Sequence, residues 1–500
     1  MTELLQQVRV IDPVSETDHL ADVLIADGYI QAVGDHISDL PENTKIRDCR
    51  GLIAGPGLVD LYSHSGEPGF EDRETLTSLL QAAAAGGFTR INILPDTSPA
   101  IDNPAVVAQL QRMRGQGDTG RGGQGGRLGA TGVGGQGSNF SPLSPPPPLS
   151  PLPPNPTSWG PVAPPLPLLQ LWGALTLDVA GKQMTELADL AAAGVVGFTD
   201  GQPWENLGLV RRVLEYLQPL GKPVAFWCCD RQIMSNGIIR EGQDSLRLGL
   251  PGNPAISETS AIASLLELVA ATKTPVHIMR VSTARSVELI AKAKSQGLPV
   301  TASTTWMHLL LDTKSIKSYN TSLNLQPPLG NPSDLAALRQ GVKTGVVDAI
   351  AIDHAPHTYE EKSQAFADAL PGAIGLELAL PLLWQYLVET GEFTALELWK
   401  ALSSRPLECL KQSTSAIASS QVAELTLFDP QQNWKVEKQN LYTLSTNTPW
   451  LGQQLSGRVV QTWCQFSKRS YSLTNPENRI SEVNNFVSDN SSNSNYTVFN

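Results

Sequence analysis

The fold is decided by a series of apolar segments that opens with residues 55–64, GPGLVDLYSH. From residue 57 onward, short apolar runs alternate with stretches that have the spacing of amphipathic helices, a pattern typical of βα units around a parallel sheet. The expected strands are Gly57–His64, Thr89–Leu94, Leu169–Ala174, Val195–Thr199, Val224–Trp227, Val276–Val281, Val300–Thr304 and Ala349–Asp353. Eight such strands predict an α/β fold, a (β/α)8 barrel of the TIM type.

The two ends of the chain predict a second, smaller unit. Residues 4–54 hold short apolar runs broken at Asp27-Gly28, a two-residue hairpin signal. Strand patterns return at Ala423–Phe428 and Gly457–Trp463. We therefore expect a composite β-sandwich domain made of residues 1–55 and 420–470, with the barrel in residues 56–419.

Two segments have compositions that do not build a core. Residues 114–165 are rich in glycine and then in proline, and residues 475–500 are rich in asparagine and serine. We expect both to be disordered. The first lies between a helix and a strand, so it belongs to the end of the barrel opposite the active-site mouth. A spacer is the favoured role, and the alternative is that its prolines bind an aromatic groove.

Composition limits the partners and the location. The 500 residues carry 36 Lys and Arg against 48 Asp and Glu, a net charge of -12, which argues against a nucleic-acid partner. No secretory signal and no bilayer-length apolar run are present, so we expect a cytoplasmic protein that does not bind membranes. The five cysteines do not form a disulfide framework and are expected to be reduced and packed.

Several motifs occur in a characteristic order. They are residues 55–60, 67–75 and 82–89 near the start, residues 248–252, 281–286 and 352–357 further on, and residues 447–452 near the end. Together they resemble bacterial dihydroorotases of the amidohydrolase superfamily, and the resemblance covers the chain apart from residues 114–165 and the tail. It implies a hydrolase of pyrimidine biosynthesis that acts on a carbon-nitrogen bond of a cyclic amide, with zinc activating the attacking hydroxide.

The resemblance also identifies the metal-binding positions, of which only half hold a residue able to bind a metal. The retained candidates are His64, Asp200 and Asp353, and Asp353 would also be the catalytic general base. The replaced positions are Tyr62, Trp227 and Arg280. A phenol ionises only near pH 10, an indole has no lone pair to donate, and a guanidinium keeps its positive charge.

The positions that would bind the substrate carboxylate are replaced as well. They are Gly66, Asp96, Gln326 and Gly330, so no substrate-binding residue of the family is retained. A carboxylate at Asp96 would repel an anionic substrate. We expect Arg280 to form a salt bridge with Asp200 or Asp353 and so to replace the charge of the metal.

Four other candidate residues are expected to be structural. His277 and His357 match family positions without a chemical role. Cys228 and Cys229 lie beside the replaced position at Trp227 and could form a thiolate site, but buried cysteines are mostly inert. We assign these four residues no chemistry.

These observations predict a divergent dihydroorotase homologue that is catalytically weak or inactive, with no metal or one weakly bound metal. Its expected role is to support aspartate transcarbamoylase, and a homo-oligomer is the other expected assembly. One alternative is an active metal-dependent cyclic amidohydrolase with a rebuilt mononuclear site of His64, Asp200 and Asp353. Another is a scaffold unrelated to pyrimidines, which could act through residues 114–165.

Overall fold

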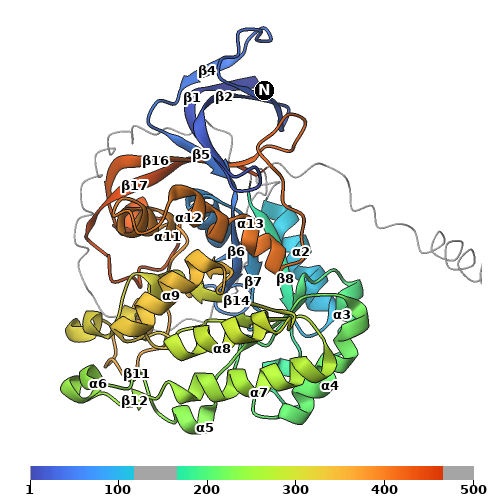
Figure 1. Ribbon diagram of the computed structural model, residues 1–500, viewed down its shortest axis with the longest axis vertical. Helices are drawn as coiled ribbons and strands as arrows, with labels where there is room; N and C mark the ends of the chain where they lie inside the picture. The colour runs from blue at the N-terminus through green and yellow to red at the C-terminus, as the bar shows by residue number, and fades with distance from the viewer. Residues whose placement is uncertain (1, 118–165, 465–500) are drawn as a thin grey trace, which may run out of the picture.

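A computed structural model describes residues 2–117 and 166–464 (Figure 1). Eight parallel strands form the barrel in chain order: β6 (Leu58–Ser63), β7 (Phe88–Ile93), β8 (Leu168–Gly173), β9 (Gly197–Phe198), β10 (Val224–Trp227), β13 (Val276–Met279), β14 (Val300–Thr305) and β15 (Ala349–Ala351). The amide of Asp353 donates to the carbonyl of Tyr62 at 3.1 Å, and the amide of His64 donates to the carbonyl of His354 at 2.8 Å, so the first and last strands meet. The predicted barrel is confirmed.

Helices follow most of the strands, and the longer ones bury one face against the sheet. They are α1 (Leu76–Ala85), α2 (Pro104–Gly117), α3 (Leu187–Ala192), α4 (Leu207–Leu217), α5 (Arg231–Met234), α6 (Gln243–Leu248), α7 (Ile256–Thr272), α8 (Ala284–Ser295), α9 (Pro332–Thr344), α10 (Tyr359–Lys362), α11 (Ala379–Leu383), α12 (Ala395–Leu402) and α13 (Ser404–Cys409). Helix α4 shows the local cause: Asn206 caps its first turn, and Leu209, Val213 and Leu217 recur on its buried face.

The two ends of the chain share one seven-stranded sheet. Its order is β17 (Gln454–Cys464), β16 (Glu424–Lys435), β5 (Ile53–Pro56), β1 (Thr2–Asp12), β2 (Thr17–Ala26) and β3 (Tyr29–Gly34), and β4 (Lys45–Asp48) pairs with β1. The turn between β2 and β3 uses Asp27 and Gly28 at φ 50° and 81°, as a two-residue hairpin requires. Figure 1 shows these strands at the upper end, above the barrel, and they fit the expected composite β-sandwich.

One predicted boundary needs correction. Helix α2 extends to Gly117, so residues 114–117 belong to a helix and not to the insertion that we expected to begin at residue 114. The helical hydrogen bonding continues in spite of the glycines at 115 and 117, whose intrinsic preference opposes it. The rest of that insertion and the expected tail lie outside the described residues. Within residues 2–117 and 166–464, no helix is both long and apolar enough to span a bilayer.

Candidate functional site

A cavity of about 120 Å³ opens at the carboxyl ends of the barrel strands. Its walls include His64, Trp227, Arg280, Gln326 and Asp353, which come from five different strand ends or loops. Ligand sites of TIM barrels are built at this face, because the loops that follow the strands converge there. The cavity therefore brings together most of the residues that the sequence singled out.

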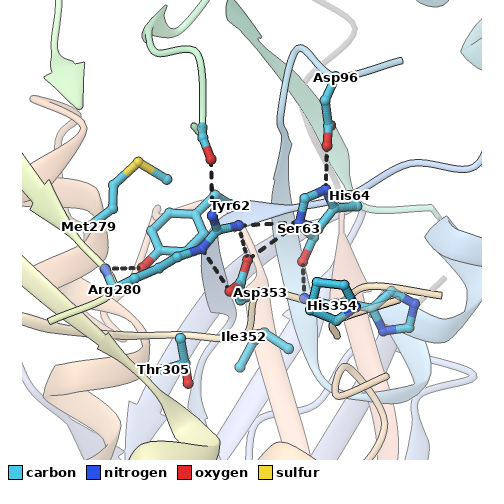
Figure 2. A network of polar contacts seen from close by, with 12 residues as sticks. Tyr62, Ser63, His64, Asp96, Met279, Arg280, Thr305, Ile352, Asp353 and His354 are labelled. Atoms are coloured by element: carbon cyan, nitrogen blue, oxygen red, sulfur yellow. Dashed lines mark hydrogen bonds and ion pairs between the residues drawn. The ribbon is translucent and has the colours of Figure 1, made fainter. Parts of the chain in front are cut away.

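Arg280 and Asp353, which both line this cavity, form a two-point ion pair (Figure 2). Nε of Arg280 donates to Oδ2 of Asp353 at 2.8 Å, and Nη2 donates to Oδ1 at 2.6 Å. A third donor, Nη1, reaches the carbonyl of Gly201 at 3.0 Å. Burial lowers the pKa of Arg280, but attraction to Asp353 outweighs that effect and leaves the pKa raised. The ion pair predicted for Arg280 therefore forms with Asp353, which favours the charged form of the guanidinium.

Two aromatic rings enclose the Arg280 guanidinium. Its Cζ lies 4.9 Å from the ring centre of Trp227 and 5.7 Å from that of Tyr62, within the range of cation–π attraction. The Tyr62 hydroxyl accepts from the Arg280 amide at 3.1 Å and lies 2.9 Å from the Ser303 hydroxyl. Burial raises the pKa of Tyr62 further above its usual value. Tyr62, Trp227 and Arg280, the three positions at which the resemblance implies lost metal ligands, thus pack into one cluster.

His64 lies at the edge of this cluster and is held by Asp96. Its Nδ1 is 2.6 Å from Oδ2 of Asp96, while its Nε2 is 3.2 Å from Arg280 Nη2 and 3.7 Å from Asp353 Oδ1 (Figure 2). Burial lowers the pKa of His64, but the charge and hydrogen bond of Asp96 outweigh it and leave the pKa raised. Asp96 therefore orients the imidazole and favours its protonated form.

Asp200 does not join His64 and Asp353. Its Oδ1 accepts from the amides of Leu175 at 2.8 Å and Thr176 at 3.0 Å, and its Oδ2 accepts from the Thr176 hydroxyl at 2.7 Å. Burial raises the pKa of Asp200 against the opposing effect of these bonds. The carboxylate thus fastens the loop after β8, and its three hydrogen bonds involve neither His64 nor the ion pair.

Comparison with known proteins assigns the chain to a family. A probable dihydroorotase-like protein of Synechocystis sp. is 42% identical over 92% of this chain and 99% of its own length. The chain belongs to the dihydroorotase family. The dihydroorotase of Pelobacter propionicus is 35% identical to this chain, over 92% of this chain and 98% of its own length. No family model matches the chain.

Solved structures agree on the fold of this dihydroorotase-family chain. An L-hydantoinase (dihydropyrimidinase) from Arthrobacter aurescens superposes with a TM-score of 0.72 at 20% identity, covering 92% of this chain and 94% of its own. A dihydropyrimidinase from Brevibacillus agri gives a TM-score of 0.69 at 17% identity, covering 93% and 96%. At these identities the likeness establishes the architecture and nothing finer.

The residues present do not fit a zinc ion. Zinc in proteins takes histidine, cysteine or carboxylate ligands, at least three of them from the protein. In the part of the chain that the structure describes, no three such side chains are grouped closely enough to hold a metal ion. Asp200 faces elsewhere, and the oxygens of Asp353 accept from Arg280. Arg280 would also repel a divalent cation.

Two of the positions that the resemblance assigns to substrate binding, Gly66 and Gly330, have no room for a side chain. A Cβ on Gly66 would lie 2.3 Å from the carbonyl oxygen of Glu74, and a Cβ on Gly330 would lie 2.5 Å from Cβ of Asp334. At contacts below 3.0 Å a neighbouring atom must shift to make room for the Cβ. Of the other two positions that the resemblance assigns to substrate binding, Gln326 lines the cavity and Asp96 bonds to His64.

The sequence did not identify the inner side chains of β14. The Ser303 hydroxyl lies 2.9 Å from both the Tyr62 hydroxyl and Nε2 of His277, and Thr305 lines the cavity. Strand alternation places Ser303 and Thr305 on one face, which is the signal that could have found them. Burial lowers the pKa of His277 to about 3, so this ring is a neutral structural partner.

The cysteines and His357 also lack features of a reactive site. All five thiols are free and buried, and burial raises the pKa of Cys229 to about 11 and that of Cys228 well above its usual value. His357 Nε2 bonds to the carbonyl of Pro371 at 2.9 Å, and burial lowers its pKa to about 4.

Proposed function

We propose that this chain is a dihydroorotase homologue whose metal centre has been replaced by the Arg280–Asp353 ion pair, so that hydrolysis of cyclic amides is weak or absent. The observation that carries the proposal is the two-point ion pair itself, with N–O distances of 2.6 and 2.8 Å. It occupies both oxygens of the carboxylate that would otherwise act as general base.

The chemistry of ring opening supports this reading. Attack on an amide carbonyl at neutral pH needs an activated hydroxide and a group that polarises the carbonyl, both of which a metal supplies in this superfamily. Here His64 is bonded to Asp96, and Asp353 is bonded to Arg280. Each carboxylate is paired with a base, Asp96 with His64 and Asp353 with Arg280, which stabilises the buried polar cluster but leaves no base directed at a substrate.

The chain retains the fold of its family, which is consistent with a role in supporting a partner protein. The barrel, the terminal sheet and the family relationship extend over the described chain, although the chemistry at the mouth has changed. We propose aspartate transcarbamoylase, the preceding enzyme of pyrimidine synthesis, as that partner. An assembly with further copies of this chain is compatible with the same role.

The first experiment measures metal content and turnover. The protein, purified from cells supplied with zinc, is analysed for bound metal and assayed with dihydroorotate and with carbamoyl aspartate, beside an active dihydroorotase as positive control. We expect substoichiometric zinc and no turnover above background. Stoichiometric zinc together with turnover of dihydroorotate would overturn the proposal.

The second experiment tests the partner. Aspartate transcarbamoylase from the same organism is run on size exclusion alone and with this chain, and its activity and thermal stability are measured in both samples. Co-elution with raised stability supports the proposal. Separate elution with unchanged activity would rule this partner out. A different protein that binds the full chain but not a variant without residues 114–165 would instead favour the alternative, a scaffold unrelated to pyrimidines.

A further inference from the structure

A second, larger cavity lies beside the barrel mouth. It measures about 320 Å³ and is bounded by α4, by the loops that follow β8 and β9, and by Phe226 on the outward face of β10. Protein interiors leave few voids larger than a water molecule, whereas sites for small organic ligands begin near this volume. The volume therefore marks a candidate binding site.

The walls of this side cavity are mainly apolar. Leu209 and Val213 of α4 face Phe226, and the ring of Trp204 meets that of Phe226 edge-on, with centres 5.2 Å apart and planes at 80°. Val179, at φ 57°, forms part of the wall in a backbone conformation that a β-branched residue rarely adopts. Such positions recur in ligand-binding loops, where surrounding structure holds them in place.

The charged groups of the side cavity comprise both signs. The Asp200 carboxylate belongs to the wall. The Thr176 hydroxyl donates to this carboxylate at 2.7 Å and accepts from the Gly181 amide at 2.8 Å. Thr176 therefore links Asp200 to the loop that contains Lys182. On the other side, Arg231 Nη2 donates to Oε1 of Gln202 at 3.4 Å. Lys182 from the loop after β8 and Arg231 from the start of α5 therefore line the same cavity as the carboxylate.

The charges around the side cavity indicate which charges its ligand should carry. Glu205 lies 4.0 Å from Arg231 and offsets part of its charge. Lys182 also lines the cavity, and it forms no ion pair within residues 2–117 and 166–464, so it remains the uncompensated cation of the rim. An organic cation would match Asp200 but meet repulsion from Lys182 and Arg231, and an organic anion would meet repulsion from Asp200. A molecule that carries both charges next to an apolar group matches all of them.

We propose that the side cavity binds a small zwitterion with an apolar body, of the chemistry of an aromatic or branched aliphatic α-amino acid. The ammonium group faces Asp200, the carboxylate faces Lys182 and Arg231, and the apolar side chain packs against Trp204 and Phe226. This inference goes beyond the proposed function and does not depend on it, since none of these residues holds the Arg280–Asp353 pair.

The two cavities nevertheless share a wall. Gln202 lines both, and the adjacent carbonyl of Gly201 accepts from Arg280 at 3.0 Å. An occupant of the side cavity therefore contacts the segment that carries a hydrogen bond of the ion pair at the mouth. Binding in the side cavity could therefore change the position of Gly201 and so the hydrogen bond that Arg280 donates to it.

The test is calorimetric titration of the full-length protein with L-phenylalanine and L-leucine, and with two analogues of phenylalanine. Phenethylamine lacks the carboxylate and 3-phenylpropanoate lacks the ammonium group. We expect saturable binding of the amino acids and binding of each analogue weaker by about tenfold, the effect of losing one charged contact. Equal affinity for the amino acid and either analogue would overturn the proposal.

Variants locate the binding. Asp200→Asn and Lys182→Gln are expected to weaken phenylalanine binding by about tenfold, whereas Lys314→Gln, an exposed lysine away from the cavity, leaves it unchanged. Lys182 is exposed, so its variant folds even where Asp200→Asn does not. Unchanged affinity in Lys182→Gln, or no binding of either amino acid by folded wild-type protein at about 10 mM, would overturn the proposal.

Discussion

Arg280 and Asp353 meet across the barrel mouth from two strand ends that both turn into left-handed backbone conformations, with φ of 56° and 52°. Neither residue is glycine, so each conformation is uncommon and must be stabilised by its surroundings. The 2.6 Å contact between Nη2 and Oδ1 and the 2.8 Å contact between Nε and Oδ2 join the two strained positions. The ion pair thus stabilises the local backbone as well as the buried charges.

Removing the guanidinium should be strongly destabilising. Arg280→Met leaves the Asp353 carboxylate beside Tyr62 and Trp227 without a counter-charge, and we expect a loss of about 3–5 kcal/mol in the free energy of unfolding. Chemical denaturation measures it. Arg211→Met is the matched control, because the Arg211–Glu215 pair is exposed and should lose no more than about 1 kcal/mol. A loss in Arg280→Met as small as in the control would show that the pair adds nothing to stability.

The barrel was predictable from sequence because its determinants are local. Apolar runs and the helical spacing between them mark all eight strands, and the hairpin at Asp27-Gly28 needs only its two turn residues. The ion pair was predictable in part, since a buried guanidinium requires a carboxylate and Asp353 was one of two candidates. These inferences depend on residue type and strand order, which the sequence contains.

The hydrogen-bond partners of the Asp200 carboxylate were not predictable in the same way. Residue type alone cannot show that its oxygens accept from Leu175 and Thr176, because that depends on the path of a neighbouring loop. The side cavity escaped prediction for the same reason, since its walls combine α4, β10 and two loops. Packing between distant segments decides both features.

The backbone around Gly66 should resist even the smallest side chain. A Cβ there would lie 2.3 Å from the carbonyl oxygen of Glu74, so Gly66→Ala is expected to lose about 1–3 kcal/mol of unfolding free energy through overpacking. Gly34→Ala is the control, because a Cβ on Gly34 meets nothing within 4 Å. Equal denaturation midpoints for the two variants would contradict the close packing at Gly66.

Restoring imidazoles at the mouth should create zinc affinity. The triple variant Tyr62→His, Trp227→His and Arg280→His supplies three donors beside His64 and removes the repelling cation. We expect zinc to raise the melting temperature of this variant, since a ligand at a hundred times its Kd contributes about 2.7 kcal/mol. Wild-type protein should show no such rise. A similar rise in wild-type protein would mean that the native mouth already holds the metal.

The five thiols should be unreactive while the protein is folded. All are buried, and burial raises the pKa of Cys49 and Cys229 to about 11, so the nucleophilic thiolate is scarce at neutral pH. Ellman's reagent should label none of them on the timescale on which a free thiol reacts completely, and should label all five in guanidinium. Fast labelling of Cys228 or Cys229 in the folded protein would revive the thiolate site that the geometry disfavours.

Glu377 should make the protein less stable as pH rises. Its Oε1 accepts from the amides of Tyr442 and Thr443 at 2.9 and 3.1 Å, yet burial raises the pKa of this carboxyl to about 8. The folded state therefore binds a proton that the unfolded state releases near pH 4.5. Between about pH 5 and 8 this group lowers the unfolding free energy by up to about 1.4 kcal/mol per pH unit.

Glu377→Gln isolates that contribution, because the amide oxygen can accept the same two bonds without titrating. Urea denaturation of both proteins at several pH values should give nearly equal stabilities near pH 5 and an advantage for the variant that grows toward pH 8. Stability curves that run parallel over this range would mean that Glu377 is ionised in the folded protein, and that the two backbone amides outweigh its burial.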